Sequence, residues 1–236
     1  MNPLNHLQYG WLIANLKDYD LRERRLIMLA SILPDLDGLP MALAPILNVL
    51  GLSALDLDRM QSLHHTFGHN IFFAAIASII LAALARKRRL DIFLVCAATV
   101  LLQIVIDNVT SDTWPIMYFW PLSKFDFSPG NFTSWPYLHL LTVWIIQGTL
   151  SVFIWTLTVV IYLRTKRTFL ELVSTNLDRL LTDFIALPFQ KSCSQCANRA
   201  HYRCSVCGKE FCIRHSQIRR DLAVICHDCA QARSGP

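Results

Sequence analysis

Seven histidine and aspartate side chains lie within or beside the apolar stretches of this 236-residue chain, where ionisable groups are costly and usually serve a function. One histidine stands near the start, a Pro-Asp-Leu-Asp-Gly turn presents two carboxylates, a six-residue run holds three histidines, and an apolar stretch ends in an aspartate. The set is His6, Asp35, Asp37, His64, His65, His69 and Asp107. Imidazole nitrogens and carboxylate oxygens together suit zinc, manganese or iron, so the set predicts a metal centre.

Helical spacing would bring parts of this set onto common faces. If residues 64–69 are helical, His65 and His69 lie four residues apart on one face, whereas His64 points about 140° away from His69. Gln103 and Asp107 have the same four-residue spacing and would face the histidines across a helix bundle.

Such a centre could perform hydrolysis, because a bound metal lowers the pKa of water and so supplies a nucleophile. One carboxylate of the Asp35 and Asp37 pair could instead act as the general base. We therefore predict catalytic roles for Asp35, Asp37 and His65. The alternatives are that the aspartates are turn or cap residues and that His6 is a helix-cap or surface histidine.

Four pairs of metal-ligand residues follow within 37 residues near the end of the chain. Two residues separate the members of each pair, and eight ligands suffice for two tetrahedral zinc ions. The pairs are Cys193 and Cys196, Cys204 and Cys207, Cys212 and His215, and Cys226 and Cys229. Four protein ligands leave no position for water, so both zinc ions would be structural. A disulfide framework is the alternative, which a reducing cytoplasm disfavours.

The order of these pairs resembles that of cross-braced modules such as B-box fingers. By that resemblance, the first and third pairs would share one zinc ion, and the second and fourth pairs the other. The formal net charge of +5 lies entirely in the last 47 residues, which hold eight basic and three acidic side chains. Seven thiolates and two zinc ions would reduce this charge to about +2, so we predict no specific nucleic-acid partner. A cytosolic protein is the expected partner, and a fold-stabilising appendage is the alternative.

The composition predicts a membrane domain around the first set of residues. The chain is 53% hydrophobic and 17% charged, whereas soluble domains carry about 25% charged residues. This argues against a soluble enzyme and against a disordered protein. Apolar stretches at residues 70–85, 92–106 and 140–163 predict membrane helices, and prolines within residues 39–55 predict a broken or re-entrant segment.

Basic clusters predict the orientation of these segments. Residues 86–89 are all basic, and three of residues 164–167 are basic, so both clusters should lie in the cytoplasm. Residues 107–137 would then face the opposite side, and the cysteine-rich tail would be cytoplasmic. If the first span is instead residues 39–55, the Pro-Asp-Leu-Asp-Gly turn falls on the cytoplasmic side and the single metal site is split.

The first half of the chain resembles the YdjM family, whose members are described as LexA-binding, inner-membrane-associated, metal-dependent hydrolases. The resemblance covers about residues 1–125 and includes Trp120-Pro121. The family's polar motif residues fall on His6, Asp35, Asp37, His64, His69 and Asp107. The chain departs from the family pattern in three places: His65 replaces Arg, Gly68-His69-Asn70 replaces Thr-His-Ser, and Gln103 replaces His. Because an amide is a poor zinc ligand, the last change would weaken or remove a metal site.

These observations predict an all-α polytopic membrane protein, with about four membrane segments and a small C-terminal zinc-binding module. Residues 1–167 would form the metal-dependent, hydrolase-like membrane domain, residues 168–190 an amphipathic linker helix, and residues 191–236 the double-zinc module. The expected function is hydrolysis of a lipid or cell-envelope ester or phosphoester, with one or two Zn²⁺ or Mn²⁺ ions in the membrane domain. The alternatives are a membrane scaffold or sensor whose zinc module recruits a cytosolic protein, and a metal-ion transporter, which would need polar residues deeper in the spans.

Overall fold

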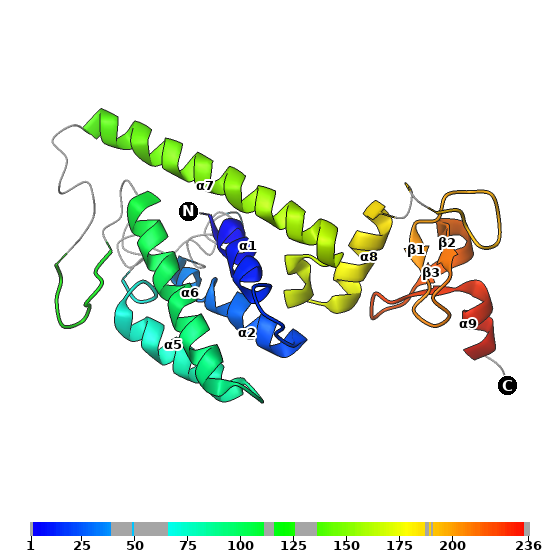
Figure 1. Ribbon diagram of the computed structural model, residues 1–236, viewed down its shortest axis with the longest axis horizontal. Helices are drawn as coiled ribbons and strands as arrows, with labels where there is room; N and C mark the ends of the chain where they lie inside the picture. Colours follow the sequence, from blue (N-terminus) through cyan, green and yellow to red (C-terminus); the bar gives the residue numbers. More distant parts are fainter. Residues whose placement is uncertain are drawn as a thin grey trace. The chain divides into compact units, whose positions relative to one another are not determined.

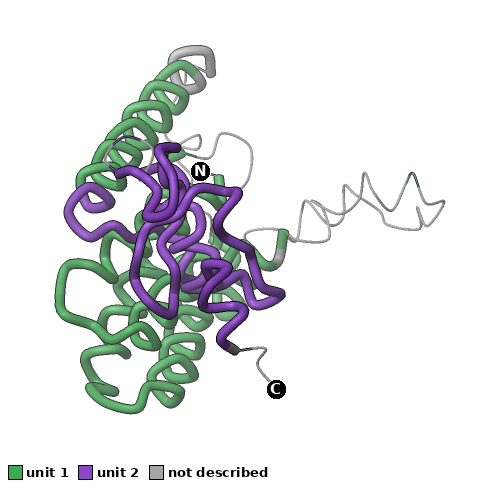
Figure 2. Tube along the Cα trace, turned by 90° about the vertical axis from the view of Figure 1, so that its right-hand side faces the viewer, with its two compact units in different colours: residues 1–160 green, residues 161–236 purple. Residues whose placement is uncertain are grey.

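A computed structural model describes residues 2–38, 49, 66–110, 116–125, 136–186, 189 and 191–233; the side chains of residues 37 and 136–140 lie outside that description. The chain forms two compact units, residues 1–160 and residues 161–236 (Figure 2). The first unit is helical, and the second combines short helices with two small hairpins.

The first unit is built from helices, most of which pack around one apolar core. They are α1 (Pro3–Ala14), α2 (Leu21–Ala30), the 3-10 turn η1 (Pro34–Gly38), α5 (Ile71–Leu84), α6 (Arg89–Thr110) and most of α7 (Pro136–Thr165) (Figure 1). Helix α5 pairs with α6, α1 with α2, and α2 also packs on α6. Trp11, Ile27, Met28, Ile92 and Ile104 are fully buried in this core.

Local capping and one close contact fix the first two helices. The Asn2 side chain accepts a hydrogen bond from the Asn5 backbone, and Asp20 and Glu23 form a reciprocal capping box at the start of α2. Gly10 of α1 lies against Ser31 at the end of α2, where a Cβ would come within 2.5 Å of the Ser31 Cβ. A larger residue at position 10 would therefore push the two helices apart.

Two helices of the described chain are long and apolar enough to cross a membrane. Helix α6 has 22 residues and Leu141–Thr165 of α7 has 25, so each exceeds the roughly 20 residues that a span requires. Helix α5 has 14 residues and rises only about 21 Å. The prediction of about four membrane segments is not confirmed, since the described residues contain two such helices. The predicted re-entrant segment 39–55 lies outside the described residues except Val49.

Large apolar side chains cover the outer faces of these helices. Ile76 and Ile79 of α5, Leu94 of α6, and Trp144 and Val152 of α7 are all more than half exposed, at 56–68%. Exposed apolar surface on this scale is typical of helices that contact lipid or a partner.

The second unit contains η3 (Phe169–Leu172), α8 (Thr175–Ala186), β1 (Tyr202–Arg203), β2 (Glu210–Phe211), the turn η5 (Ile213–His215), β3 (Ser216–Ile218), β4 (Val224–Cys226) and α9 (His227–Arg233). Strands β1 and β2 form one antiparallel hairpin, in which Tyr202 is opposite Phe211. Strands β3 and β4 form the other, with Ser216 opposite Cys226. Cysteines and Phe211 make up most of the buried centre.

The predicted amphipathic helix from residue 168 is interrupted. Ser174 separates η3 from α8, because its hydroxyl accepts hydrogen bonds from the Asn176 and Leu177 backbones. Asp178 of α8 in turn accepts a hydrogen bond from the Thr168 backbone and folds η3 back onto the helix. Only Thr175–Ala186 is a continuous α-helix in this region.

Candidate metal centre

His6 enters the site from the first turns of α1. Pro3 and the Asn2 cap start the helix only a few residues earlier, which fixes the direction of the His6 side chain. The imidazole is completely buried. Tyr9, one turn later, packs edge-on against the ring at 5.7 Å between centroids, and its hydroxyl donates to the Thr99 carbonyl of α6 at 3.3 Å. Tyr9 therefore holds the His6 face of α1 against α6.

Asp35 lies in the η1 turn, where the chain leaves α2. Pro34 and Gly38 bound this turn, and proline favours the start rather than the interior of a helix. The Asp35 side chain is 12% exposed and is the most accessible of the polar groups that meet here. The Asp37 backbone belongs to the same turn, but its side chain lies outside the described residues.

His69 comes from the turn that precedes α5, not from a helix. Asn70 is the N-cap of α5: its side chain accepts from the Phe73 backbone and donates to the Thr66 and Phe67 carbonyls. The helix considered for residues 64–69 does not include His69, because the capping residue that starts α5 follows it. His64 and His65 lie outside the described residues, so their predicted roles remain untested.

Gly68 brings this turn against η1. A Cβ at position 68 would lie 2.8 Å from the Pro34 Cα and would also collide with the Pro34 carbonyl oxygen. Only glycine allows the two backbones to approach so closely. This contact places His69 beside Asp35, although 34 residues separate them in sequence.

Asp107 and Gln103 complete the site from α6, one helical turn apart. Both are buried, Gln103 fully and Asp107 to 2% exposure. Their common face agrees with the prediction from four-residue spacing. Helix α6 continues to Thr110, so Asp107 lies in its last turn rather than at its end.

Each imidazole contacts both carboxylates. His6 Nδ1 lies 2.7 Å from Asp35 Oδ2, and His6 Nε2 lies 3.1 Å from Asp107 Oδ1. His69 Nε2 lies 3.3 Å from Asp107 Oδ2 and 3.6 Å from Asp35 Oδ1. Ligands about 2.0 Å from a tetrahedral zinc ion are separated by about 3.3 Å, and both contacts to Asp107 are close to this value. His6, Asp35 and Asp107 each offer one ligand atom, and these atoms lie within 4.8 Å of one another.

Charge balance also favours a cation at this position. Burial acts to raise the pKa of the Asp35 carboxyl, but hydrogen bonds to His6 and His69 outweigh it and hold that pKa below its usual value. Burial acts to lower the pKa of the His6 ring, while hydrogen bonds to Asp107 and Asp35 raise it above its usual value. Two buried carboxylates need compensating positive charge, which protonated histidine or a divalent metal can provide.

The cysteine-rich unit contains two further groups of ligand atoms. Cys193, Cys196, Cys212 and His215 form one group, and Cys204, Cys207, Cys226 and Cys229 form the other. These are the first and third pairs and the second and fourth pairs, the same arrangement that the B-box resemblance implies. All eight cysteines of the chain are free of disulfide bonds.

Distances within both groups suit tetrahedral coordination. The Cys196 and Cys212 sulfurs are 3.8 Å apart, and the Cys207 and Cys226 sulfurs 3.9 Å apart. Sulfurs about 2.3 Å from a tetrahedral zinc ion are separated by about 3.8 Å. His215 approaches through Nδ1, which lies 3.3 Å from the Cys212 sulfur.

Backbone amides prepare these thiols for metal binding. Partial burial acts to raise the pKa of Cys193, but backbone N–H groups at Cys212 and Gln195, together with His215, lower it to about 6. Burial opposes ionisation of Cys204 as well, and backbone N–H groups at Cys207 and Cys226 lower its pKa to about 6. One thiol of each group is therefore ionised at neutral pH before a metal binds.

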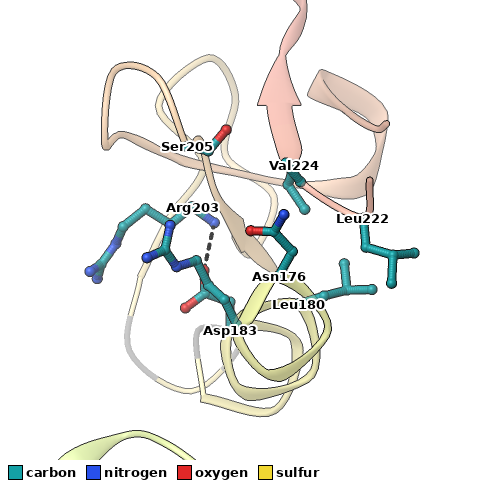
Figure 3. A pocket seen from close by; sticks show the side chains of 9 residues that line it. Asn176, Leu180, Asp183, Arg203, Ser205, Leu222 and Val224 are labelled. Atoms are coloured by element: carbon teal, nitrogen blue, oxygen red, sulfur yellow. Dashed lines mark hydrogen bonds between the residues drawn. The ribbon is translucent and has the colours of Figure 1, made fainter. Parts of the chain in front are cut away.

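Helix α8 packs on the cysteine-rich module as part of the same unit. Phe184 stacks on His201 with 5.4 Å between ring centroids, and the Arg203 backbone donates to Asp183 (Figure 3). Asn176 donates to the Asp221 carbonyl at 2.9 Å. A small pocket between α8 and the hairpins is lined by Asn176, Asp183 and Arg203 together with neighbouring side chains (Figure 3). The amphipathic pattern of α8 did not reveal this packing partner.

The sequence model of the family described as YdjM inner membrane protein matches residues 1–174. The chain belongs to this family. No curated protein and no solved structure matches it. The resemblance to the YdjM family is thereby confirmed, and the match extends beyond the predicted limit of about residue 125 to include α7 and η3. The cysteine-rich residues 191–233 lie outside the match.

Four of the residues on which the predicted resemblance to the YdjM family rests lie together in one site. His6, Asp35, His69 and Asp107 meet in it. Gly68 and Asn70 flank His69: Gly68 allows the close approach to Pro34, and Asn70 caps α5. Trp120 of the Trp-Pro element packs edge-on against Phe67, in the turn that carries His69, with 4.9 Å between ring centroids.

Gln103 makes contacts that the sequence did not predict. Its Nε2 lies 2.9 Å from Asp35 Oδ1 and 3.1 Å from His6 Nδ1. The spacing from Asp107 had placed it on the correct face, but its chemistry had suggested only a missing ligand. In the structure it contacts two of the residues that meet at the site.

Proposed function

We propose that the YdjM domain of this protein is a membrane-bound, metal-dependent hydrolase. The observation that carries the proposal is the meeting of two imidazoles and two carboxylates from α1, η1, the turn before α5, and α6, at separations of 2.7–3.6 Å. A divalent ion such as Zn²⁺ or Mn²⁺ bound by this set would lower the pKa of a coordinated water to near neutrality.

The chain's own residues would perform three tasks in this reaction. His6, His69 and Asp107 are almost completely buried and would hold the ion in a fixed position. Asp35, at 12% exposure, is the carboxylate that an entering substrate or water would meet first. The surrounding apolar core would exclude bulk water and strengthen the electrostatic interactions within the site.

The position of the site along the helices favours a substrate at the membrane surface. His69 comes two residues before α5 begins, and Asp107 lies in the last turn of α6, so both mark the same end of this antiparallel pair. The ends of spanning helices lie near the lipid headgroups, about 15 Å from the bilayer centre. Ester and phosphoester bonds of lipids or cell-envelope precursors occur at that depth, and we propose them as the substrate class.

The same geometry supports a multi-pass orientation. The basic residues 86–89 lie at the opposite end of the α5 and α6 pair, and basic side chains favour the cytoplasm. The metal site would then face the extracytoplasmic side of the inner membrane. Helix α7 would return the chain to the cytoplasm, where Arg164 and Arg167 follow its apolar span.

The C-terminal module would contain two structural Zn²⁺ ions, since each group provides four protein ligands. We propose that it recruits a cytosolic protein. Ile213 and Ile218 on this module are half exposed or more, at 57% and 50%. A membrane scaffold or sensor is the second candidate function, because the module lies outside the part of the chain that matches the YdjM family.

Metal analysis of the full-length protein in detergent tests the proposal. We expect about three metal ions per chain by mass spectrometry and about two in the His6→Ala/Asp107→Ala variant. The Cys196→Ser/Cys212→Ser variant is the matched control and should retain the ion of the membrane domain. Two ions in the unchanged protein would overturn the hydrolase proposal.

Activity provides the second readout. The protein in vesicles of phosphatidylethanolamine and phosphatidylglycerol, supplied with Zn²⁺ or Mn²⁺, should release hydrolysis products that the His6→Ala/Asp107→Ala variant does not. Three metal ions without any product from lipid or envelope phosphoesters would instead favour the sensor function.

A further inference from the structure

Gln103 directs its side-chain amide wholly at the metal site. The residue is fully buried in the middle of the α6 face that also carries Asp107. Its Nε2 contacts Asp35 Oδ1 at 2.9 Å and His6 Nδ1 at 3.1 Å. Among the described residues, its Oε1 has no hydrogen-bond partner. Both contacts of the side-chain amide are therefore with residues of the metal site, Asp35 and His6, and neither stabilises the helix itself.

Proton positions around His6 Nδ1 determine which contact is a true hydrogen bond. Nδ1 lies 2.7 Å from Asp35 Oδ2 and 3.1 Å from Gln103 Nε2. A ring nitrogen that carries a proton can donate to the carboxylate but cannot accept from the amide. The shorter, charge-assisted bond to Asp35 is the stronger one. Nδ1 therefore carries the proton, and the Gln103 amide donates to Asp35 Oδ1.

This arrangement leaves His6 Nε2 as the ligating nitrogen. Nε2 points to Asp107, whose Oδ1 is 3.1 Å away. His69 Nε2 is also closer to Asp107, at 3.3 Å, than it is to Asp35, at 3.6 Å. Asp35 uses one oxygen for His6 and the other for Gln103. Metal-bound histidines commonly donate their second N–H to a carboxylate that orients the ring.

We infer that Gln103 is a positioning residue that holds Asp35 as the outer partner of His6. This inference rests on the proposed metal-dependent function and specifies its geometry. The ion is held by His6 Nε2, His69 Nε2 and Asp107, and Asp35 and Gln103 form a hydrogen-bonded chain behind His6. Within the described residues this gives three protein ligands, the number that catalytic zinc sites combine with a bound water.

Manganese binding tests this assignment in the full-length protein, with its thiolate sites first filled with zinc. The electron paramagnetic resonance signal of free Mn²⁺ gives the affinity and stoichiometry of the remaining site. Asp107→Ala, which removes an inner ligand, should abolish binding. Asp35→Asn and Gln103→Met, which disturb the outer chain, should weaken it about 10–100-fold at unchanged stoichiometry. Gln103→His, which keeps an N–H donor, should recover most of the affinity.

A matched control separates this role from general packing. Thr99 is a buried polar residue one turn earlier on α6, and its hydroxyl donates to the Val95 carbonyl and not to the site. Thr99→Val should leave Mn²⁺ affinity within twofold of the unchanged protein. The low-temperature spectrum of bound Mn²⁺ should keep its zero-field splitting in Gln103→Met, because the inner ligands are the same.

The outcomes distinguish the two levels of the proposal. If the unchanged protein binds no Mn²⁺ beyond the zinc sites, the proposed function fails. If it binds Mn²⁺ but Asp35→Asn abolishes binding as completely as Asp107→Ala, Asp35 is an inner ligand and the inference alone fails. Affinity of Gln103→Met equal to that of the unchanged protein would overturn the positioning role.

Discussion

Gly68 lies directly on the backbone of Pro34, so that the turn before α5 and the turn after α2 share one contact without side chains between them. This contact sets the distance between His69 and Asp35, two groups of the proposed metal centre. Its consequences can be measured, because Gly148, unlike Gly68, lies in open space and provides a control.

Gly68→Ala should damage the metal centre without affecting the cysteine-rich module. The added Cβ would lie 2.8 Å from the Pro34 Cα, and relief of such overpacking typically costs about 1–3 kcal/mol. Because the collision would displace His69, we expect Mn²⁺ affinity, measured by titration, to fall by at least tenfold. Gly148→Ala is the control: in the part of the chain that the structure describes, no atom beyond its own helical turn and chain neighbours would lie within 4 Å of the added Cβ, and alanine favours the helix by about 1 kcal/mol. Equal metal affinity in the two variants would refute this role of Gly68.

The cross-braced arrangement predicts the outcome of paired cysteine substitutions. Cys196 and Cys212 belong to one group of ligands, so the double variant Cys196→Ser/Cys212→Ser should lose one zinc ion and retain the other. Cys196→Ser/Cys226→Ser removes one ligand from each group and should lose both ions. Native mass spectrometry counts the ions directly. A sequential pairing of neighbouring Cys pairs would instead remove both ions in the first variant.

Acidification should release zinc from the module as thiolates become protonated. The pKa values of Cys193 and Cys204 are held at about 6, below the usual thiol value of about 8.5. A lowered pKa favours the folded, ligating form at higher pH, and this contribution is lost as the pH falls through 6. Zinc release to a chromophoric chelator should therefore be slight at pH 7.5 and extensive by pH 5. Half-release at or above pH 7 would contradict these pKa values.

Phe184→Ala should loosen α8 from the module while both zinc ions remain bound. Phe184 stacks on His201 and also approaches Tyr202, with 6.0 Å between the latter centroids. Aromatic pairs contribute about 0.5–1.5 kcal/mol beyond the area they bury. Amide hydrogen exchange in Thr175–Ala186 should accelerate by roughly tenfold, whereas Ile185→Ala, at a site 57% exposed, should change it little. Unchanged exchange in both variants would mean that other contacts dominate the docking.

Short-range physics made much of the fold predictable. Four-residue spacing correctly placed Gln103 and Asp107 on one face of α6, and the Pro-Asp-Leu-Asp-Gly sequence correctly ended the helical run. The capping preference of asparagine would also have separated His69 from α5, since Asn70 starts that helix. The longer apolar stretches matched α6 and α7 to within a few residues.

Contacts between distant segments were not accessible from the same patterns. Nothing in the sequence indicates that the Gln103 amide meets Asp35, because that distance depends on how α1, η1 and α6 pack together. The same holds for Phe184 and His201, whose stacking joins α8 to the hairpins. Gly68 shows the limit most clearly: an isolated glycine before a helix is ambiguous until the neighbouring backbone is known.

The groups that would hold the ion of the YdjM domain span residues 6–107, whereas the ligands of the module span residues 193–229. During synthesis the first site cannot exist until α6 has been placed beside α1, since Asp107 comes from the last turn of that helix. The cysteine and histidine ligands of the module all come from one short segment, and none of them comes from α6 or α7. If both sites bind metal as proposed, metallation occurs at two separate moments: one follows the packing of α6 against α1, and the other follows synthesis of the cysteine-rich segment.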